Sequence, residues 1–218
     1  MLARIQLALA AALAVVAAVL AGLLLTDAGT PPAAPAELGV GPSGFVGALR
    51  PEIPPQDFRL TDEEGRPVAL SDFRGQVVAV TFLYTTCEDT CPITTSQIRG
   101  ALDDLGRDVP VLAVSVDPAG DTRARARRFL LEQRMTGRMR FLLGSPAELE
   151  RVWKAYGIQP QGRGKEAFDH SAHVVLIDRA GRQRIGHPVA KLRPEGLAHD
   201  LRVLADERPR RGGDPSRQ

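Results

Sequence analysis

Residues 77–92 read VVAVTFLYTTCEDTCP. The first part of this stretch, up to Tyr84, is apolar, aromatic or β-branched without alternation, which is typical of a strand buried on both faces of a sheet. The only two cysteines of the chain, Cys87 and Cys91, follow closely, and Pro92 is suited to the first position of a helix. Ligand sites of α/β folds lie at such strand-to-helix junctions. Two thiols at this place can form a disulfide or bind a soft metal.

Strand and helix patterns alternate along the chain beyond this stretch. Further strands are predicted at residues 109–116, 140–143, 172–178 and 183–188, and helices at residues 93–105, 121–133, 147–156 and 192–204. A small hairpin, formed by residues 58–60 and 67–70 around a turn at Gly65, is expected on the N-terminal side. This order predicts an α/β protein with a thioredoxin-like fold and an additional N-terminal hairpin, preceded by one transmembrane helix.

The composition divides the chain into four parts. They are an N-terminal membrane anchor at residues 1–26, a Pro/Ala/Gly-rich tether at 27–55, the thioredoxin-like domain at 56–206 and a charged tail, expected to be disordered, at 207–218. The uncharged run at residues 7–25 would reach about 28 Å as a helix, close to a hydrocarbon core of about 30 Å. A cleaved signal peptide is the alternative, but its apolar core is usually only about 7–15 residues long.

Both interpretations place the domain on the extracytoplasmic, periplasmic side of a membrane. Arg4 is the only charged residue before the apolar run and Asp27 is the first after it, which favours a cytoplasmic N-terminus. Disulfides persist in such a compartment, so the location suits either use of the cysteine pair. The formal net charge of +2 is too small to indicate nucleic-acid binding.

The spacing of the cysteines bears on their chemistry. Three residues separate Cys87 from Cys91, whereas the Cys-x-x-Cys pair of thioredoxin-type oxidoreductases has two. The wider spacing gives the sulfurs more freedom to converge on a ligand, and the helix start near Cys91 favours a thiolate. Thiolates select Cu(I), and an added imidazole makes Cu(II) acceptable as well. A copper site therefore predicts a histidine that is distant in sequence and near in space.

The chain offers four histidines. His170 is the candidate ligand, because it stands just before a predicted strand and after the Gly-rich residues 161–164, a segment able to carry a ligand onto the dithiol. His173 is only a reserve ligand. It lies three positions after His170, so in an extended chain the two side chains would point to opposite faces. His187 and His199 are expected to be structural or solvent-exposed.

Three aspartates near the predicted site have alternative interpretations. Asp169 would contact the histidine or cap the entry to the strand, and the sequence supports both equally. Asp89 is expected to cap its loop rather than to act as an electrostatic neighbour of the thiols. Asp117 is expected to cap the turn at Pro118.

Three stretches together resemble the SCO/SenC family of cytochrome c oxidase copper chaperones. They are VTFLYTTCEDTCP at residues 80–92, SVDP at 115–118 and DHS at 169–171. The resemblance implies a copper ion held by Cys87, Cys91 and His170. Glu88 departs from the family, which commonly has proline there, and this bears on the stiffness of the loop rather than on the ligand set.

The resemblance implies a metallochaperone rather than a true enzyme. Such a protein would bind Cu(I) or Cu(II) and assist assembly of the binuclear copper site of cytochrome c oxidase, with the copper-site subunit of a haem–copper oxidase as its partner. The alternative is an extracytoplasmic thiol–disulfide oxidoreductase that uses Cys87 and Cys91 as a redox pair to reduce the cysteines of that subunit or of another partner. A peroxidase-like enzyme is disfavoured, because the two cysteines lie closer together than in most such enzymes.

Overall fold

The computed structural model describes residues 38–51, 53–159 and 172–207, together with residues 6, 10, 13–16 and 19. The chain divides into two units, Met1–Glu37 and Leu38–Gln218. Most of the predicted membrane anchor, the first part of the predicted tether up to residue 37, and nearly all of the predicted tail lie outside the described residues. Within the described residues, no helix has the length and apolar character needed to cross a membrane.

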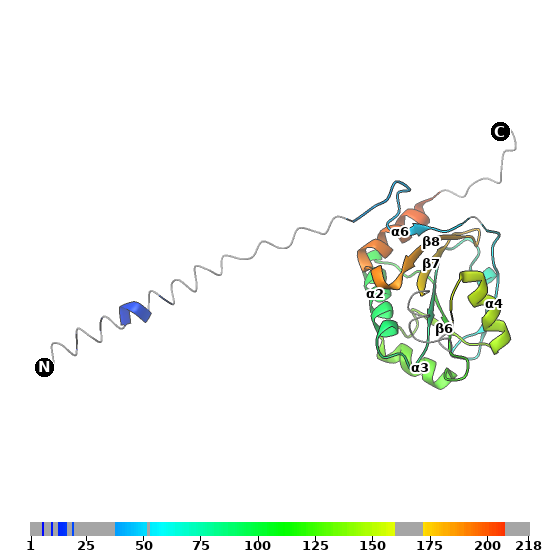
Figure 1. The fold of residues 1–218 in the computed structure, drawn as a ribbon, viewed down its shortest axis with the longest axis horizontal. Coiled ribbons are helices and arrows are strands. Elements are labelled where there is room, and N and C mark those ends of the chain that lie inside the picture. Colours follow the sequence, from blue (N-terminus) through cyan, green and yellow to red (C-terminus); the bar gives the residue numbers. More distant parts are fainter. Residues whose placement is uncertain are drawn as a thin grey trace. The chain divides into compact units, whose positions relative to one another are not determined.

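The second unit is built on a six-stranded mixed sheet with the order β1-β8-β7-β4-β5-β6 (Figure 1). Its central strand, β4, is buried along its whole length and pairs in parallel with β5 on one edge and antiparallel with β7 on the other. The strands are β1 (Ala48–Leu49), β4 (Val78–Leu83), β5 (Val111–Ser115), β6 (Arg140–Leu142), β7 (His173–Ile177) and β8 (Gln183–Pro188). The α/β architecture predicted from the sequence is confirmed.

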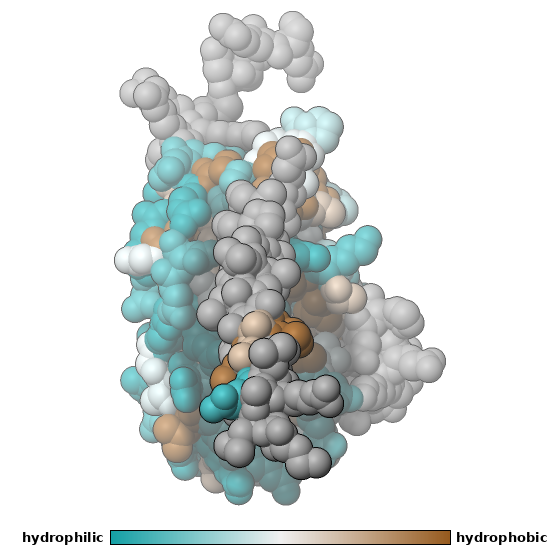
Figure 2. Space-filling model, turned by 90° about the vertical axis from the view of Figure 1, so that its left-hand side faces the viewer, coloured by the Kyte–Doolittle hydropathy of each residue, from teal (hydrophilic) through white to brown (hydrophobic). Residues whose placement is uncertain are grey.

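Helices cover both faces of this sheet (Figure 1). Helices α2 (Thr90–Leu105) and α6 (Pro194–Asp206) pack against each other on one face, and α4 (Pro146–Tyr156) lies on the other. The outward surface on the α2 and α6 side is mostly hydrophilic apart from scattered apolar patches (Figure 2). Both faces of β4 are therefore shielded from water, which explains its uninterrupted apolar sequence.

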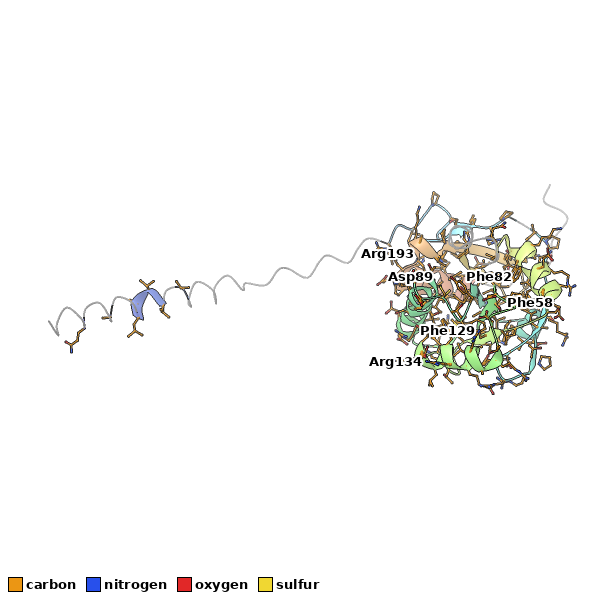
Figure 3. All side chains as sticks on the ribbon, turned by 60° about the horizontal axis from the view of Figure 1, so that its bottom comes forward. Phe58, Phe82, Asp89, Phe129, Arg134 and Arg193 are labelled. Carbon is orange, nitrogen blue, oxygen red and sulfur yellow. The ribbon has the colours of Figure 1, made fainter. Side chains whose placement is uncertain are left out.

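Aromatic side chains bind the helices to the sheet. The ring of Phe82, on β4, lies 5.4 Å from that of Tyr156 on α4. Helix α3 (Arg123–Glu132) directs Phe129 inward, where its ring meets Phe141 of β6 edge-on at 5.9 Å. In Figure 3, Phe82 lies inside the domain and Arg134, just after α3, lies at its edge.

Side chains close in sequence cap two of the helix starts, and the start of a third differs from the prediction. Ser145 caps α4 in a reciprocal pair with Glu148, and the side chain of Thr122 caps α3. Helix α2 begins at Thr90, earlier than predicted, so that Pro92 is its third residue and not its first. A proline is tolerated there because the N–H groups of the first turn have no partner within the helix.

The predicted N-terminal hairpin is present, and a second hairpin lies within the main sheet. Strands β2 (Arg59–Thr61) and β3 (Pro67–Ala69) pair antiparallel to form the N-terminal hairpin. Its turn places Gly65 at φ 85°, a left-handed conformation that glycine adopts without steric cost. Strands β7 and β8 form the second hairpin.

The sheet also includes residues that the sequence analysis assigned to the tether. Strand β1 pairs antiparallel with β8 at the edge of the sheet, and Phe45, just before it, is buried. A strand of two residues is too short to show an alternating pattern, so periodicity could not reveal it.

A buried carboxylate, Asp200 of α6, holds this N-terminal segment in place. It accepts hydrogen bonds from the backbone N–H groups of Val46 and Gly47, both at 2.8 Å. The Nδ1 of His199 is hydrogen-bonded to Oδ1 of Asp200 at 2.9 Å. The Nε2 of His187 lies 3.0 Å from Oδ2 of Asp200, which is within ion-pair distance, but this contact lacks the alignment of a hydrogen bond. Burial alone would raise the pKa of Asp200, but these polar contacts together hold the pKa below its ordinary value.

We expect Asp200→Ala to lower the free energy of unfolding of the full chain by about 3 kcal/mol at neutral pH, because it leaves two backbone N–H groups without their acceptor. Urea titration measures this loss. The folded-state pKa of Asp200 is depressed, so its contribution is complete above the ordinary pKa of about 3.9 and disappears as the pH falls through the folded-state pKa. The difference between wild type and variant should therefore shrink in acid.

The matched control is Asp206→Ala, which removes an exposed carboxylate from the last turn of the same helix. It should change the free energy of unfolding by less than about 0.5 kcal/mol. Equal effects of the two substitutions would contradict the role assigned to Asp200.

Candidate metal centre

The two cysteines lie where β4 passes into α2. Cys87 is in the connecting loop, and Cys91 is the second residue of the helix. The backbone N–H of Cys91 donates a hydrogen bond to Sγ of Cys87 at 3.1 Å. Both thiols are reduced and buried, Cys91 completely and Cys87 to 7% exposure. The fold thus brings two soft donors together at the carboxyl end of the central strand.

The surroundings of the two thiols shift their pKa values in opposite directions. Hydrogen bonding from the Cys91 side chain, aided by the Cys91 N–H, lowers the pKa of Cys87 to about 6 against the opposing effect of burial. Burial is the main reason that the pKa of Cys91 is raised, and the neighbouring Cys87 raises it further. At neutral pH the pair therefore carries one thiolate, at Cys87, and one thiol that donates to it.

Cys87 lines a surface depression. This depression has a volume of about 380 Å³ and lies between the cysteine loop and helix α3; its lining is Thr85, Thr86, Cys87, Glu88, Arg125, Arg128, Phe129 and Glu132. Cys91 is not part of the lining. A partner approaching from this side meets the sulfur of Cys87 first.

The loop that carries Cys87 is held by a residue whose role the sequence analysis missed. The buried carboxylate of Asp121 accepts hydrogen bonds from the backbone N–H and the hydroxyl of Thr85, at 2.7 and 2.6 Å. Asp121 was expected only to begin helix α3. One sequence signal could have indicated that Asp121 lies near Cys87. Asp121 stands in the loop after β5, and β5 is the parallel neighbour of β4, whose following loop carries Cys87.

The other predicted neighbours of the site have modest roles. Asp117 accepts a hydrogen bond from the N–H of Gly120 at 3.0 Å, which confirms it as the cap of the turn at Pro118. Asp89 occupies the N-cap position of α2, but its side chain makes no capping hydrogen bond. Glu88, where the family commonly has proline, is exposed.

The histidines fall into two groups. His187 and His199 contact Asp200, in keeping with the structural role expected of them. His173 is half-buried at the beginning of β7. His170 and Asp169 lie outside the described residues, and within those residues no cluster of three metal-binding side chains is found.

Comparisons with known proteins agree on one family. The family model described as SCO1/SenC matches residues 49–206. Protein SenC of Rhodobacter capsulatus is 33% identical over 130 residues, which cover 56% of this chain and 57% of that protein. The solution structure of apo Sco1 from Thermus thermophilus is 29% identical, with a TM-score of 0.61 over 73% of this chain and 96% of its own. The structure of Bradyrhizobium japonicum ScoI with copper bound is 30% identical, with a TM-score of 0.55 over 70% and 99%.

We predict that alkylation of Cys87 by iodoacetamide follows a titration with a midpoint near pH 6, because only the thiolate reacts. Cys91 should stay unmodified over the same range, since its raised pKa keeps it protonated. Mass spectrometry of the reduced full chain after short exposures across pH 4–9 gives both curves. In Cys91→Ala, which removes the donor thiol, the midpoint for Cys87 should move up towards the ordinary value of about 8.5. A midpoint near 8.5 in the wild type would contradict the assignment.

Proposed function

Because the chain belongs to the SCO1/SenC family, we propose that it binds copper and takes part in the assembly of cytochrome c oxidase as a metallochaperone. The observation that carries this proposal is the pair of reduced, adjacent cysteines at the end of the central strand. Copper is the cargo of this function rather than a resident cofactor. Its partner would be the copper-site subunit of a haem–copper oxidase.

The proposed ligands are Cys87, Cys91 and His170. The two sulfurs are soft donors, and the N–H of Cys91 already lies 3.1 Å from the sulfur of Cys87. Strand β7 runs antiparallel to β4, so its beginning at His173 lies towards the end of β4, near the dithiol. His170 precedes that strand by only three residues in the sequence, and chain connectivity favours its reaching the two sulfurs.

The donor set suits copper in either oxidation state. Two thiolates and a neutral imidazole leave a Cu(I) complex with one net negative charge and a Cu(II) complex neutral. Transfer to a partner that also presents thiols can then proceed by stepwise exchange of ligands. The depression beside Cys87 supports exchange that begins at this sulfur, since Cys91 is buried behind it.

We further propose that residues 1–26 anchor the protein in a membrane and that residues 27–37 tether the domain on the extracytoplasmic side, since the segment from Leu38 onward belongs to the domain that contains β1. The uncharged run at residues 7–25 and its flanking charges support this arrangement. Residues 208–218 would form a solvated tail, whereas Glu207 is ion-paired with Arg184 at 2.8 Å.

A thiol–disulfide oxidoreductase is the second candidate function. The observation that favours it is the lowered pKa of Cys87, because a thiolate at neutral pH attacks disulfides readily. In that case Cys87 would attack the partner's disulfide, forming a mixed disulfide and releasing one partner sulfur as a thiol. Cys91 would then close a Cys87–Cys91 disulfide and release the second partner sulfur as a thiol.

Copper titration of the reduced full chain distinguishes the two functions. We expect the wild type to bind one equivalent of copper, and Cys87→Ala or Cys91→Ala to lose tight binding, because each removes a thiolate ligand. His170→Ala should lower the affinity at least tenfold and change the thiolate-to-Cu(II) absorption. The control is His199→Gln, on helix α6, which should leave both unchanged.

An unaltered affinity and spectrum in His170→Ala would contradict the proposed ligand set. If that variant also retained full disulfide reductase activity towards a thiol-bearing partner peptide, the oxidoreductase would be the better description of the protein.

A further inference from the structure

Asp121 is a buried carboxylate that its own helix does not use. It lies in the turn between β5 and α3 and is 8% exposed. The next residue, Thr122, caps α3 by accepting a hydrogen bond from the N–H of Arg125 at 3.2 Å. The carboxylate of Asp121 is therefore free to act elsewhere.

Both oxygens of this carboxylate accept hydrogen bonds at the end of the central sheet. Oδ1 accepts from the backbone N–H and the hydroxyl of Thr85, and Oδ2 accepts from the hydroxyl of Ser115 at 2.5 Å. Thr85 precedes Cys87 by two residues, whereas Ser115 is the last residue of β5. Asp121 thus joins the cysteine loop to the neighbouring strand.

The far end of this connection is rigid. Ser115 pairs with Leu83 in the parallel ladder between β5 and β4, and its side chain is fully buried. Its carbonyl oxygen also accepts a hydrogen bond from Nε1 of Trp153, on α4, at 2.9 Å. A loop fastened to Ser115 through Asp121 is therefore fastened to the core.

Folding stability alone gives a weak reason for a carboxylate at this position. Within the described part of the chain, no cation pairs with Asp121, so a buried negative charge is offset only by three neutral donors. Burying such a charge is costly, and a neutral side chain would avoid the cost. Its negative charge also lies close enough to Cys91 to interact with that sulfur.

We propose that Asp121 is a positioning residue for the dithiol. By holding Thr85 it sets the place of Cys87 relative to the first turn of α2, and thereby keeps the sulfurs of Cys87 and Cys91 at a spacing that one copper ion can bridge. The copper part of this proposal rests on the proposed function. The part that concerns the geometry and charge around the two sulfurs does not.

The test uses the reduced full chain and the variants Asp121→Ala and Asp121→Asn. Competition with a chromogenic chelator measures the Cu(I) affinity, which should fall at least tenfold in Asp121→Ala, the usual effect of removing a residue that supports metal ligands. In Asp121→Asn the fall should be smaller, because the amide oxygen can still accept from Thr85.

A second readout needs no copper. In glutathione buffers, oxidised glutathione takes two electrons and two protons from the dithiol, which leaves two reduced glutathione molecules and a Cys87–Cys91 disulfide. Removing the negative charge of Asp121 stabilises the thiolate form, so the constant for this oxidation should fall about tenfold in both variants, equivalent to about 30 mV for two electrons.

Asp117→Asn is the matched control, because this carboxylate lies in the same turn but bonds only to the N–H of Gly120. It should change both constants by less than twofold. If Asp121→Ala does not fold, Thr85→Val and Ser115→Ala, which each remove one hydroxyl donor to Asp121 but keep its charge, should lower the Cu(I) affinity as well, without the fall in the glutathione constant.

A purely structural role for Asp121 predicts a different outcome. The variants would then unfold at lower urea concentration, while the folded protein kept the wild-type copper affinity and glutathione constant, and the proposal would be overturned. A wild type that binds no copper, combined with a shifted glutathione constant in the variants, would refute the proposed function and leave the positioning role supported.

Discussion

Strand β4 is hydrogen-bonded along both edges, and the candidate site depends on that constraint. Its parallel pairing with β5 brings the loops that follow the two strands to the same edge of the sheet. One of these loops carries Cys87, and the other carries Asp121. The carboxylate of Asp121 accepts hydrogen bonds from Thr85 and so joins the two loops. The antiparallel pairing with β7 directs the beginning of that strand towards the same edge. The sheet therefore gathers, at one place, groups that are far apart in the sequence.

Helix α2 adds the second constraint on the cysteines. Because the helix begins at Thr90, Cys91 lies in its first turn, where backbone N–H groups lack partners within the helix. One of these groups, the N–H of Cys91 itself, is satisfied by the sulfur of Cys87. Because the two cysteines are four positions apart and the helix begins between them, the backbone N–H of Cys91 lies against the sulfur of Cys87. The same contact helps to stabilise a thiolate at Cys87.

The N-terminal segment is attached to the domain by a different buried carboxylate. Asp200 accepts from Val46 and Gly47 across more than 150 positions of sequence, and β1 extends the sheet beyond β8. Two histidines that might be mistaken for metal ligands from the sequence, His187 and His199, contribute to this attachment instead. Buried aspartates thus fasten loops both near the dithiol and at the edge of the sheet.

The sequence by itself determined the main strands and helices, the cap of α4, and the two thiols at the end of β4. These features are encoded locally, in hydrophobic periodicity and in capping residues a few positions apart. The membership of SCO1/SenC was likewise visible in three short motifs. Only the tertiary structure decided that β1 joins the sheet, that α2 begins before Pro92, and that Asp121 and Asp200 hold distant loops. Each of these depends on hydrogen bonds between segments remote in the chain or on the packing of a short segment, and neither leaves a periodic signal in the sequence.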